Sequence, residues 1–178
     1  MRIVAGVWRG RRIRPPDDSR VRPTADRVRE AWMSIVQPRL VDARVLDLFA
    51  GSGALGLEAL SRGAASATFV EVSASGVRAI RANAEFLGAT EATTILRGDA
   101  VRYVEKLEPG AFDVAFADPP YGHSLAAAVV DRWLAVPFAT LLGVEHAAKE
   151  AMPATAETRR YGSTAISFYR AERPAAAE

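Results

Sequence analysis

The chain has 178 residues, of which 49% are hydrophobic and 25% charged, and this balance predicts a globular domain with a sizeable core. It contains no cysteine, which excludes a disulfide framework, thiolate zinc sites and a cysteine nucleophile. No apolar run approaches the roughly 18 residues that cross a bilayer, and the first residues lack the apolar core of a signal peptide. We therefore expect a cytoplasmic protein without membrane contact.

Positive charge gathers at the N-terminus, although the formal net charge of the whole chain is only +2. Residues 1–22 contain seven arginines and two aspartates, which leaves this segment with +5. Residues 4–14 are predicted to form a short hairpin that bends near Gly6 or Gly10. Arginines beside a tryptophan suit phosphate contact and base stacking, whereas the alternative is a solvated edge ribbon whose charges prevent strand pairing. The candidate nucleic-acid-binding residues are Trp8, Arg9, Arg11, Arg12 and Arg14.

Helices and strands are expected to alternate through the rest of the chain. An amphipathic helix over residues 24–36 begins at the N-cap Thr24 and places Trp32 in the core. Strands are predicted over residues 45–49, 67–71, 93–96, 112–117 and 140–145. Further helices are predicted from residue 55, from residue 73 or 75 to 87, over residues 101–107 and over residues 124–134. A final hairpin over residues 157–170 turns at Gly162, and the alternation predicts a parallel sheet with helices on both faces.

The rest of the chain is organised around residues 45–60, which read as a buried strand, a glycine turn and the start of a helix. The glycines at 51, 53 and 56 have the spacing of the dinucleotide fingerprint, which nucleotide and S-adenosylmethionine (SAM) sites share. A tight turn without a ligand is the alternative. Asp47 argues against it, because a carboxylate inside an apolar strand is costly to bury unless a ligand ammonium or backbone amides pair with it.

Acidic residues end the first three predicted strands, namely Asp47, Glu71 and Asp99. Ligands of open parallel sheets bind beyond the carboxyl ends of the strands. Glu71 follows Gly53 by 18 residues, close to the spacing at which an acid holds a ribose diol in NAD or SAM sites. Each acid alone could instead cap a helix or lie on the surface.

The tetrapeptide Asp118-Pro119-Pro120-Tyr121 follows the fourth predicted strand and favours SAM over NAD. Its prolines rigidify the turn, so that the Asp118 carboxylate and the Pro119 carbonyl can accept both hydrogens of one exocyclic amine. Tyr121 can stack on the ring that carries the amine. Such an amine is a poor nucleophile because its lone pair is delocalised, and two acceptors help it to pyramidalise and attack a methyl group. The alternative is a Pro-Pro turn with an aspartate by chance.

The motifs at residues 47–56 and 118–121 together resemble those of the SAM-dependent amino-methyltransferases. The whole chain resembles the RsmD family of bacterial 16S rRNA guanine-N2 methyltransferases. Residues 2–11, 22–30 and 47–63 and the final hairpin carry this resemblance. The motif at 118–121 does not specify the base, since adenine-N6 and cytosine-N4 enzymes share it, whereas the arginine-rich start indicates the family.

The resemblance implies an α/β, Rossmann-like class I SAM-dependent methyltransferase fold with a mostly parallel seven-stranded sheet. Residues 1–22 would form an N-terminal β-hairpin extension and residues 23–178 the SAM-dependent methyltransferase domain. The cofactor would be SAM, and the partner would be 16S rRNA in the small ribosomal subunit or in its assembly intermediate. The protein would be a monomer, and no metal is implied.

The resemblance also assigns residues to the site. The cofactor-binding residues would be Asp47, Phe49, Gly51, Gly53, Glu71, Asp99, Ala100, Arg22 and Thr24. Among them, Glu71 would take the ribose hydroxyls, Asp99 with Ala100 the adenine, and residues 22–24 would close over the cofactor. The catalytic residues around the flipped guanine would be Asp118, Pro119, Pro120 and Tyr121.

Three other functions compete with this reading. A nicotinamide-dependent oxidoreductase would share the glycine turn but has no need of residues 118–121. A DNA adenine-N6 methyltransferase would share residues 118–121 but usually carries a target-recognition domain, for which 178 residues leave no space. A non-catalytic RNA-binding domain would not need residues 118–121 intact.

Overall fold

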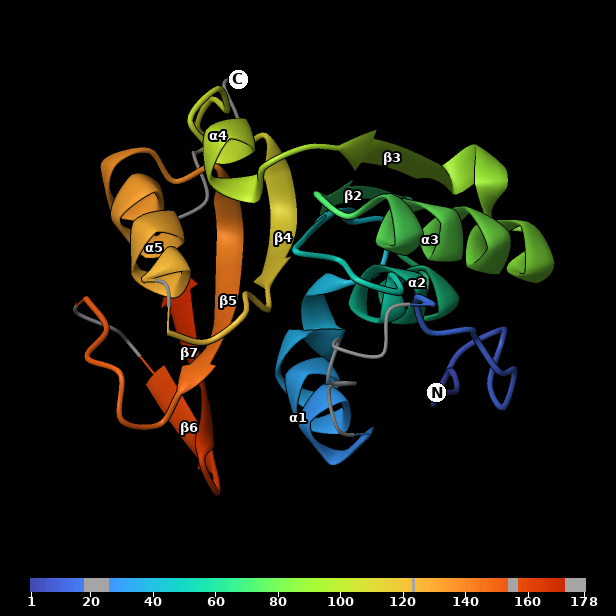
Figure 1. Ribbon diagram of the computed structural model, residues 1–178, viewed down its shortest axis with the longest axis horizontal. Coiled ribbons are helices and arrows are strands. Elements are labelled where there is room, and N and C mark those ends of the chain that lie inside the picture. The colour runs from blue at the N-terminus through green and yellow to red at the C-terminus, as the bar shows by residue number, and fades with distance from the viewer. Residues whose placement is uncertain (18–25, 123, 154–156, 172–178) are drawn as a thin grey trace.

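The computed structural model describes residues 1–17, 26–122, 124–153 and 157–171 (Figure 1). These residues build a seven-stranded sheet in the order β3-β2-β1-β4-β5-β7-β6. Strands β1 to β5 run parallel to their neighbours in that group, and β7 runs antiparallel to both β5 and β6. The strands are β1 (Arg44–Leu48), β2 (Ser66–Glu71), β3 (Thr93–Arg97), β4 (Phe112–Ala117), β5 (Ala139–Ala147), β6 (Glu157–Tyr161) and β7 (Thr164–Arg170).

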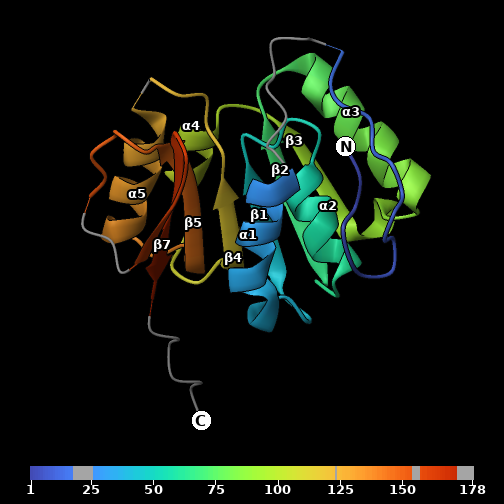
Figure 2. The same cartoon turned by 90° about the horizontal axis from the view of Figure 1, so that it is seen from below.

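Helices cover both faces of the sheet, as the alternation predicts (Figure 2). Side chains of α1, α2 and α3 pack in the hydrophobic cluster on one face, and side chains of α4 and α5 pack in the cluster on the other. The helices are α1 (Asp26–Val36), α2 (Ala54–Ser61), α3 (Ala74–Leu87), α4 (Ala100–Val104) and α5 (Leu125–Ala135), with short 3-10 turns η1 (Gln37–Arg39) and η2 (Thr90–Ala92).

Trp32 lies at the centre of the first cluster, which confirms its predicted place in the core. It is fully buried and meets Phe116 and Phe168 edge-on, with ring centroids 5.4 and 5.8 Å away. Gly143 on β5 makes room for the indole, because a Cβ there would lie 2.3 Å from a Trp32 ring carbon. Trp32 therefore packs directly on the backbone of β5.

From α1 to β7 the predicted elements are confirmed in order and type, and their ends differ by a few residues. Helix α4 ends at Val104, because the amides of Lys106 and Leu107 bond to carbonyls three residues earlier and tighten the last turn. Strand β5 reaches Ala147, because β7 pairs with it as far as Thr164. Ser73 is the cap of α3 and accepts the Gly76 amide at 3.0 Å. The predicted cap Thr24 lies outside the described residues.

The N-terminal segment reverses direction, but the predicted β-hairpin is reduced to one antiparallel bridge, between Arg2 and Arg12, in the part the structure describes. Gly6 and Gly10 both have φ of +84°, so both predicted bend positions are used. Gly6 also approaches α2 closely, since a Cβ there would lie 1.8 Å from the Ser61 carbonyl oxygen. The segment therefore packs against the domain beside α2 and α3 and is not a free ribbon (Figure 1).

Helix α2 takes the backbone groups that a partner strand would otherwise use, which explains why regular pairing stops. The buried Glu58 carboxylate accepts the amides of Val4 and Ala5 at 2.8 and 2.9 Å. Ser61 accepts the amide of Val7 through its carbonyl at 2.8 Å and the amide of Trp8 through its hydroxyl at 3.0 Å. These bonds tie residues 4–8 to α2.

Candidate active site at the carboxyl ends of the strands

The strand order reverses at β1, which lies between β2 and β4, so the chain crosses the sheet in opposite directions from this point. Open α/β sheets bind ligands at such a point, beyond the carboxyl ends of the strands. Asp47 on β1, Glu71 at the end of β2 and Asp118 directly after β4 all belong to this edge. The structure thus brings together three carboxylates that lie far apart in the sequence.

The glycine turn between β1 and α2 holds a strained backbone. Phe49 has φ of +57°, which is costly for a residue with a bulky side chain, and Gly51 and Gly53 have φ of +56° and +78°. A Cβ at Gly56 would lie 2.4 Å from the Phe69 ring, so this glycine lets α2 pack on β2. A Cβ at Gly51 would meet nothing within 4 Å, so this peptide borders open space where a ligand can approach.

Asp47 is almost fully buried, and its Oδ2 accepts the amide of Gly56 at 2.8 Å. Burial raises the pKa of Asp47 well above its usual value, the Gly56 hydrogen bond opposes this, and the negative charges of Asp118 and Glu71 raise the pKa further. The Gly56 amide is therefore one of the polar partners that we expected for the buried Asp47 carboxylate. The two neighbouring carboxylates leave an electrostatic cost that a cation bound between them would relieve.

Glu71 ties the glycine turn to the start of α3. Its Oε2 accepts the amide of Gly51 at 2.8 Å, and its Oε1 accepts the amide of Ser73 at 2.7 Å. Gly76 leaves space for this side chain, since a Cβ there would lie 2.6 Å from the Glu71 Cγ. Sequence reasoning missed this backbone role. The predicted contact of Glu71 with a ribose stays a prediction, for which each oxygen keeps a further lone pair.

Asp99 caps α4, because its Oδ1 accepts the Arg102 amide at 2.8 Å. The helix-cap alternative for this residue therefore holds, and it leaves the second oxygen for another partner. Ala100, the first residue of α4, is buried. Their predicted contact with an adenine stays a prediction. Arg22 and Thr24, the other two predicted cofactor contacts, lie outside the described residues.

The tetrapeptide at residues 118–121 leaves the sheet next to β1, where the Asp118 amide reaches the Leu48 carbonyl at 3.5 Å. Pro119 is buried, Pro120 is exposed, and Tyr121 is 40% exposed. Burial chiefly raises the pKa of Tyr121 to about 12, so its hydroxyl stays protonated in the neutral range. The predicted stacking of Tyr121 on a base stays a prediction.

Glu145 and Thr164 are site residues that sequence reasoning missed. The Tyr121 hydroxyl donates to Glu145 Oε1 at 2.9 Å and lies 2.8 Å from the Thr164 hydroxyl. Burial chiefly, and then the charge of Asp118, raise the pKa of Glu145 to about 7, and polar interactions with Tyr121 and Trp32 oppose this rise. Glu145 ends the predicted strand 140–145, so the strand-end argument used for the other acids could have found it. Thr164 carries no such signal.

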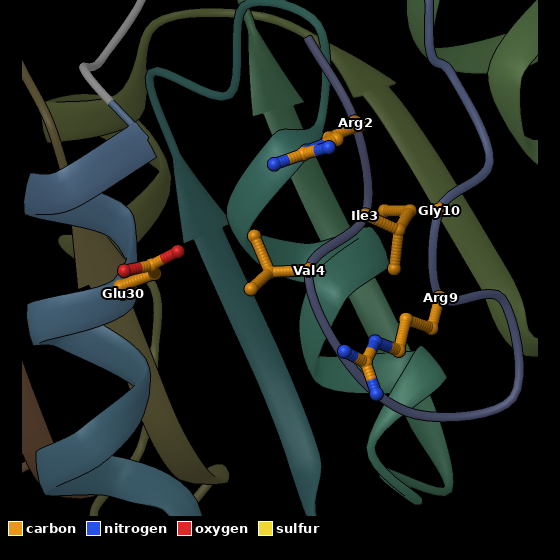
Figure 3. A pocket seen from close by; sticks show the side chains of 6 residues that line it. All are labelled: Arg2, Ile3, Val4, Arg9, Gly10 and Glu30. Carbon is orange, nitrogen blue, oxygen red and sulfur yellow. The ribbon is translucent and has the colours of Figure 1, made fainter.

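The predicted nucleic-acid-binding residues lie on the docked N-terminal segment. Arg9, Arg11, Arg12 and Arg14 are exposed, whereas Trp8 is partly buried against the core. The Arg11 guanidinium lies over the ring of Phe86 on α3, 5.8 Å from its centroid. A pocket of about 230 Å³ lies between this segment and α1 (Figure 3). Its lining residues are Arg2, Ile3, Val4, Arg9, Gly10 and Glu30.

Asn83 on α3 joins the N-terminal segment to the glycine turn. Its side chain is buried, accepts the Arg14 amide at 2.8 Å and donates to the Arg14 carbonyl at 2.9 Å. It also donates to the Ser52 carbonyl at 3.0 Å. The Asn83 side chain therefore links the backbone at Arg14 directly to the glycine turn at Ser52.

Two general properties concern the described residues only. No helix among them is both long enough and apolar enough to cross a membrane. In the same part of the chain, no three side chains of the metal-ligating types gather as an ion site. His146 is buried and shares a hydrogen bond of 2.8 Å with Ser167, whereas His123 lies outside the described residues.

Solved structures with this fold include the Escherichia coli protein yhhF, which is 33% identical over 97% of this chain and 98% of that chain, with a TM-score of 0.83. An RNA methyltransferase from Salinibacter ruber in complex with S-adenosyl-L-homocysteine is 14% identical over 88% of this chain and 100% of that chain, with a TM-score of 0.66. The second likeness shows the fold alone. The sheet order and the glycine turn define the class as the SAM-dependent methyltransferase fold.

Family comparison narrows the class. The family described as conserved hypothetical protein 95 matches residues 1–170. "Ribosomal RNA small subunit methyltransferase D" of Escherichia coli K12 is 42% identical over 70% of this chain and 62% of that protein, so the chain spans under two thirds of that relative's length. The Bacillus subtilis protein YlbH is 32% identical over 96% of this chain and 98% of that protein. The chain belongs to this family, the RsmD family.

Proposed function

We propose that the protein transfers a methyl group from SAM to the exocyclic N2 amine of a guanine in bacterial 16S rRNA. The observation that carries this proposal is the position of Asp118 and Tyr121 directly after β4. There Asp118 joins Asp47 and Glu71 in a carboxylate cluster beside the glycine turn. The names of the relatives support an rRNA substrate in the small ribosomal subunit. The N2 amine is the finer part of the proposal and rests on the resemblance to the family.

The carboxylate cluster suits SAM because this cofactor is a cation. SAM carries a sulfonium and an ammonium group beside one carboxylate. Burial chiefly raises the pKa of Asp47, and either positive group of SAM would offset the further rise that comes from the charges of Asp118 and Glu71. Glu71 would take the ribose hydroxyls with the lone pairs that its two backbone bonds leave. The proposed cofactor contacts are Asp47, Phe49, Gly51, Gly53, Glu71, Asp99 and Ala100, with Arg22 and Thr24 as the covering residues.

Asp118 and Pro119 would activate the amine. When bound, SAM supplies a methyl group on a positively charged sulfur. The Asp118 carboxylate and the Pro119 carbonyl would accept the two amine hydrogens, which directs the nitrogen lone pair towards the methyl carbon. Tyr121 would stack on the guanine ring, and Asp118 would be the nearest acceptor for the proton that the methylated nitrogen releases.

The test is methyl transfer to 16S rRNA, both as naked RNA and in small subunits, followed by nucleoside mass spectrometry. We expect N2-methylguanosine from the wild-type protein. Asp118→Ala should lower turnover by about a hundredfold or more at saturating SAM, by analogy with removal of one transition-state hydrogen-bond partner. The variant should keep SAM binding. Asp131→Ala, on the exposed side of α5, is the matched control for loss of an aspartate.

Two results would contradict the proposal. The first is N6-methyladenine in a DNA substrate with no methylated guanine in RNA, which would favour the DNA adenine methyltransferase reading. The second is wild-type turnover by Asp118→Ala, which would remove residues 118–121 from the chemistry.

A further inference from the structure

The Tyr121 hydroxyl is held by two strands that the proposed reaction does not otherwise use. Glu145 on β5 and Thr164 on β7 contact it at 2.9 and 2.8 Å. The register explains how both reach one hydroxyl. Glu145 lies opposite Ile166, and Thr164 is two residues from Ile166 on the same strand, so both side chains project from the same face of the sheet.

Glu145 is almost fully buried, whereas the Tyr121 side chain is only partly covered by its neighbours. Glu145 is 6% exposed and Tyr121 is 40% exposed. Glu145 Oε2 is buried and has no hydrogen-bond partner in the part of the chain that the structure describes, so Oε1 is the oxygen engaged. Tyr121 sits in a loop, followed by Gly122 with φ of +86°. The hydroxyl contacts with Glu145 and Thr164 therefore restrict the orientation of a ring that is partly exposed to solvent.

We propose that Glu145 is a positioning residue, which holds the Tyr121 ring in the orientation from which it stacks on the target base. This inference rests on the proposed function for the identity of the base. Glu145 does not touch the base in this arrangement, because Oε1 is bonded to Tyr121 and Oε2 is buried. It acts by fixing the ring before the base arrives, so that less conformational freedom is lost when the base binds.

The first test compares the kinetics of four variants: Glu145→Ala, Glu145→Gln, Tyr121→Phe, and Glu145→Ala combined with Tyr121→Phe. Glu145→Ala should lower kcat about tenfold, as for loss of a hydrogen bond to a charged group, and leave SAM affinity unchanged. Glu145→Gln keeps an acceptor and should stay within about threefold of wild type. If Glu145 acts through the hydroxyl, Tyr121→Phe and the double variant should match Glu145→Ala.

The second test measures the environment of the Tyr121 ring by NMR and needs no methyl transfer. The chain has four tyrosines, so fluorotyrosine labelling gives a fluorine NMR spectrum in which Tyr121→Phe identifies the Tyr121 signal. Glu145→Ala should move this signal towards that of a freely exposed tyrosine, and Glu145→Gln should leave it in place. The control variant is Glu91→Ala, because Glu91 is exposed and lies in η2, far from Glu145 in the sequence. It should not move the Tyr121 signal.

An unmoved Tyr121 signal in a folded Glu145→Ala protein would overturn the inference, as would losses that multiply in the double variant. Failure of the proposed function looks different. In that case the wild-type protein would not methylate guanine, yet the fluorine signal would still respond to Glu145→Ala. If Glu145→Ala does not fold, wild-type kcat in Tyr121→Phe would overturn the inference by itself.

Discussion

Replacing Glu145 with glutamine should remove a pH-dependent loss of stability. Burial raises the pKa of Glu145 from 4.5 to about 7, so ionising this group is harder in the folded than in the unfolded chain. Its contribution to stability is complete below pH 4.5 and is lost as the pH rises through 7. The whole rise corresponds to about 3 kcal/mol, of which about 2–3 kcal/mol falls between pH 5 and pH 8. Glutamine keeps an acceptor for Tyr121 and does not ionise.

Urea unfolding at constant ionic strength, followed by circular dichroism at several values between pH 5 and pH 8, measures this effect. The free energy of unfolding of Glu145→Gln minus that of wild type should grow by about 2–3 kcal/mol across this range. Because the prediction concerns the change with pH, any fixed cost of the amide cancels, and the raised pKa of Asp47 affects both proteins. Glu91→Gln controls for loss of a surface carboxylate. Parallel curves for Glu145→Gln and wild type would refute the reasoning.

Four further predictions concern ligands. Glu71→Ala should weaken SAM binding about ten- to a hundredfold in calorimetry, from loss of a hydrogen bond to a charged group, and an unchanged affinity would remove Glu71 from the site. Tyr121→Ala should lower activity through lost stacking of roughly 1–3 kcal/mol, and full activity would show that the ring does not hold the base. Replacing Arg9, Arg11 and Arg12 with alanine should weaken RNA binding and flatten the log–log salt slope by up to about two, at about 0.7 per contact on single strands. Trp8→Ala should weaken binding with little change in slope, because stacking releases no counterions. Wild-type affinity and slope in the triple variant would return the segment to the role of a solvated edge.

Most of the fold could be predicted because its signals are local. The apolar run before Asp47, the glycines after it and the cap at Ser73 each act within a few residues, so the chain order reveals them. The N-terminal hairpin is less regular than predicted. Its turn residues cannot show that Glu58, some fifty positions later, accepts the amides of Val4 and Ala5.

The missed part of the site depends on long-range pairing. Thr164 reaches Tyr121 only because β7, and not β6, lies next to β5, and a hairpin pattern does not say which arm joins the sheet. The backbone role of Glu71 was hidden for a similar reason. The sequence shows an acid at a strand end but does not show whether that acid binds a ribose or accepts a backbone amide, as Glu71 does from Gly51.

Asn83 connects the segment proposed to meet RNA with the turn proposed to meet the cofactor, so we expect the two proposed ligands to affect each other's binding. One amide group holds both Arg14, in the segment proposed to meet RNA, and Ser52, in the turn proposed to meet the cofactor. If RNA shifts one end of this bridge, the equilibrium at the other end shifts, and the coupling must be equal in both directions. SAM affinity measured with and without RNA should then differ in wild type and converge in Asn83→Ala. A single dissociation constant for either ligand would accordingly describe the protein only at a stated concentration of the other.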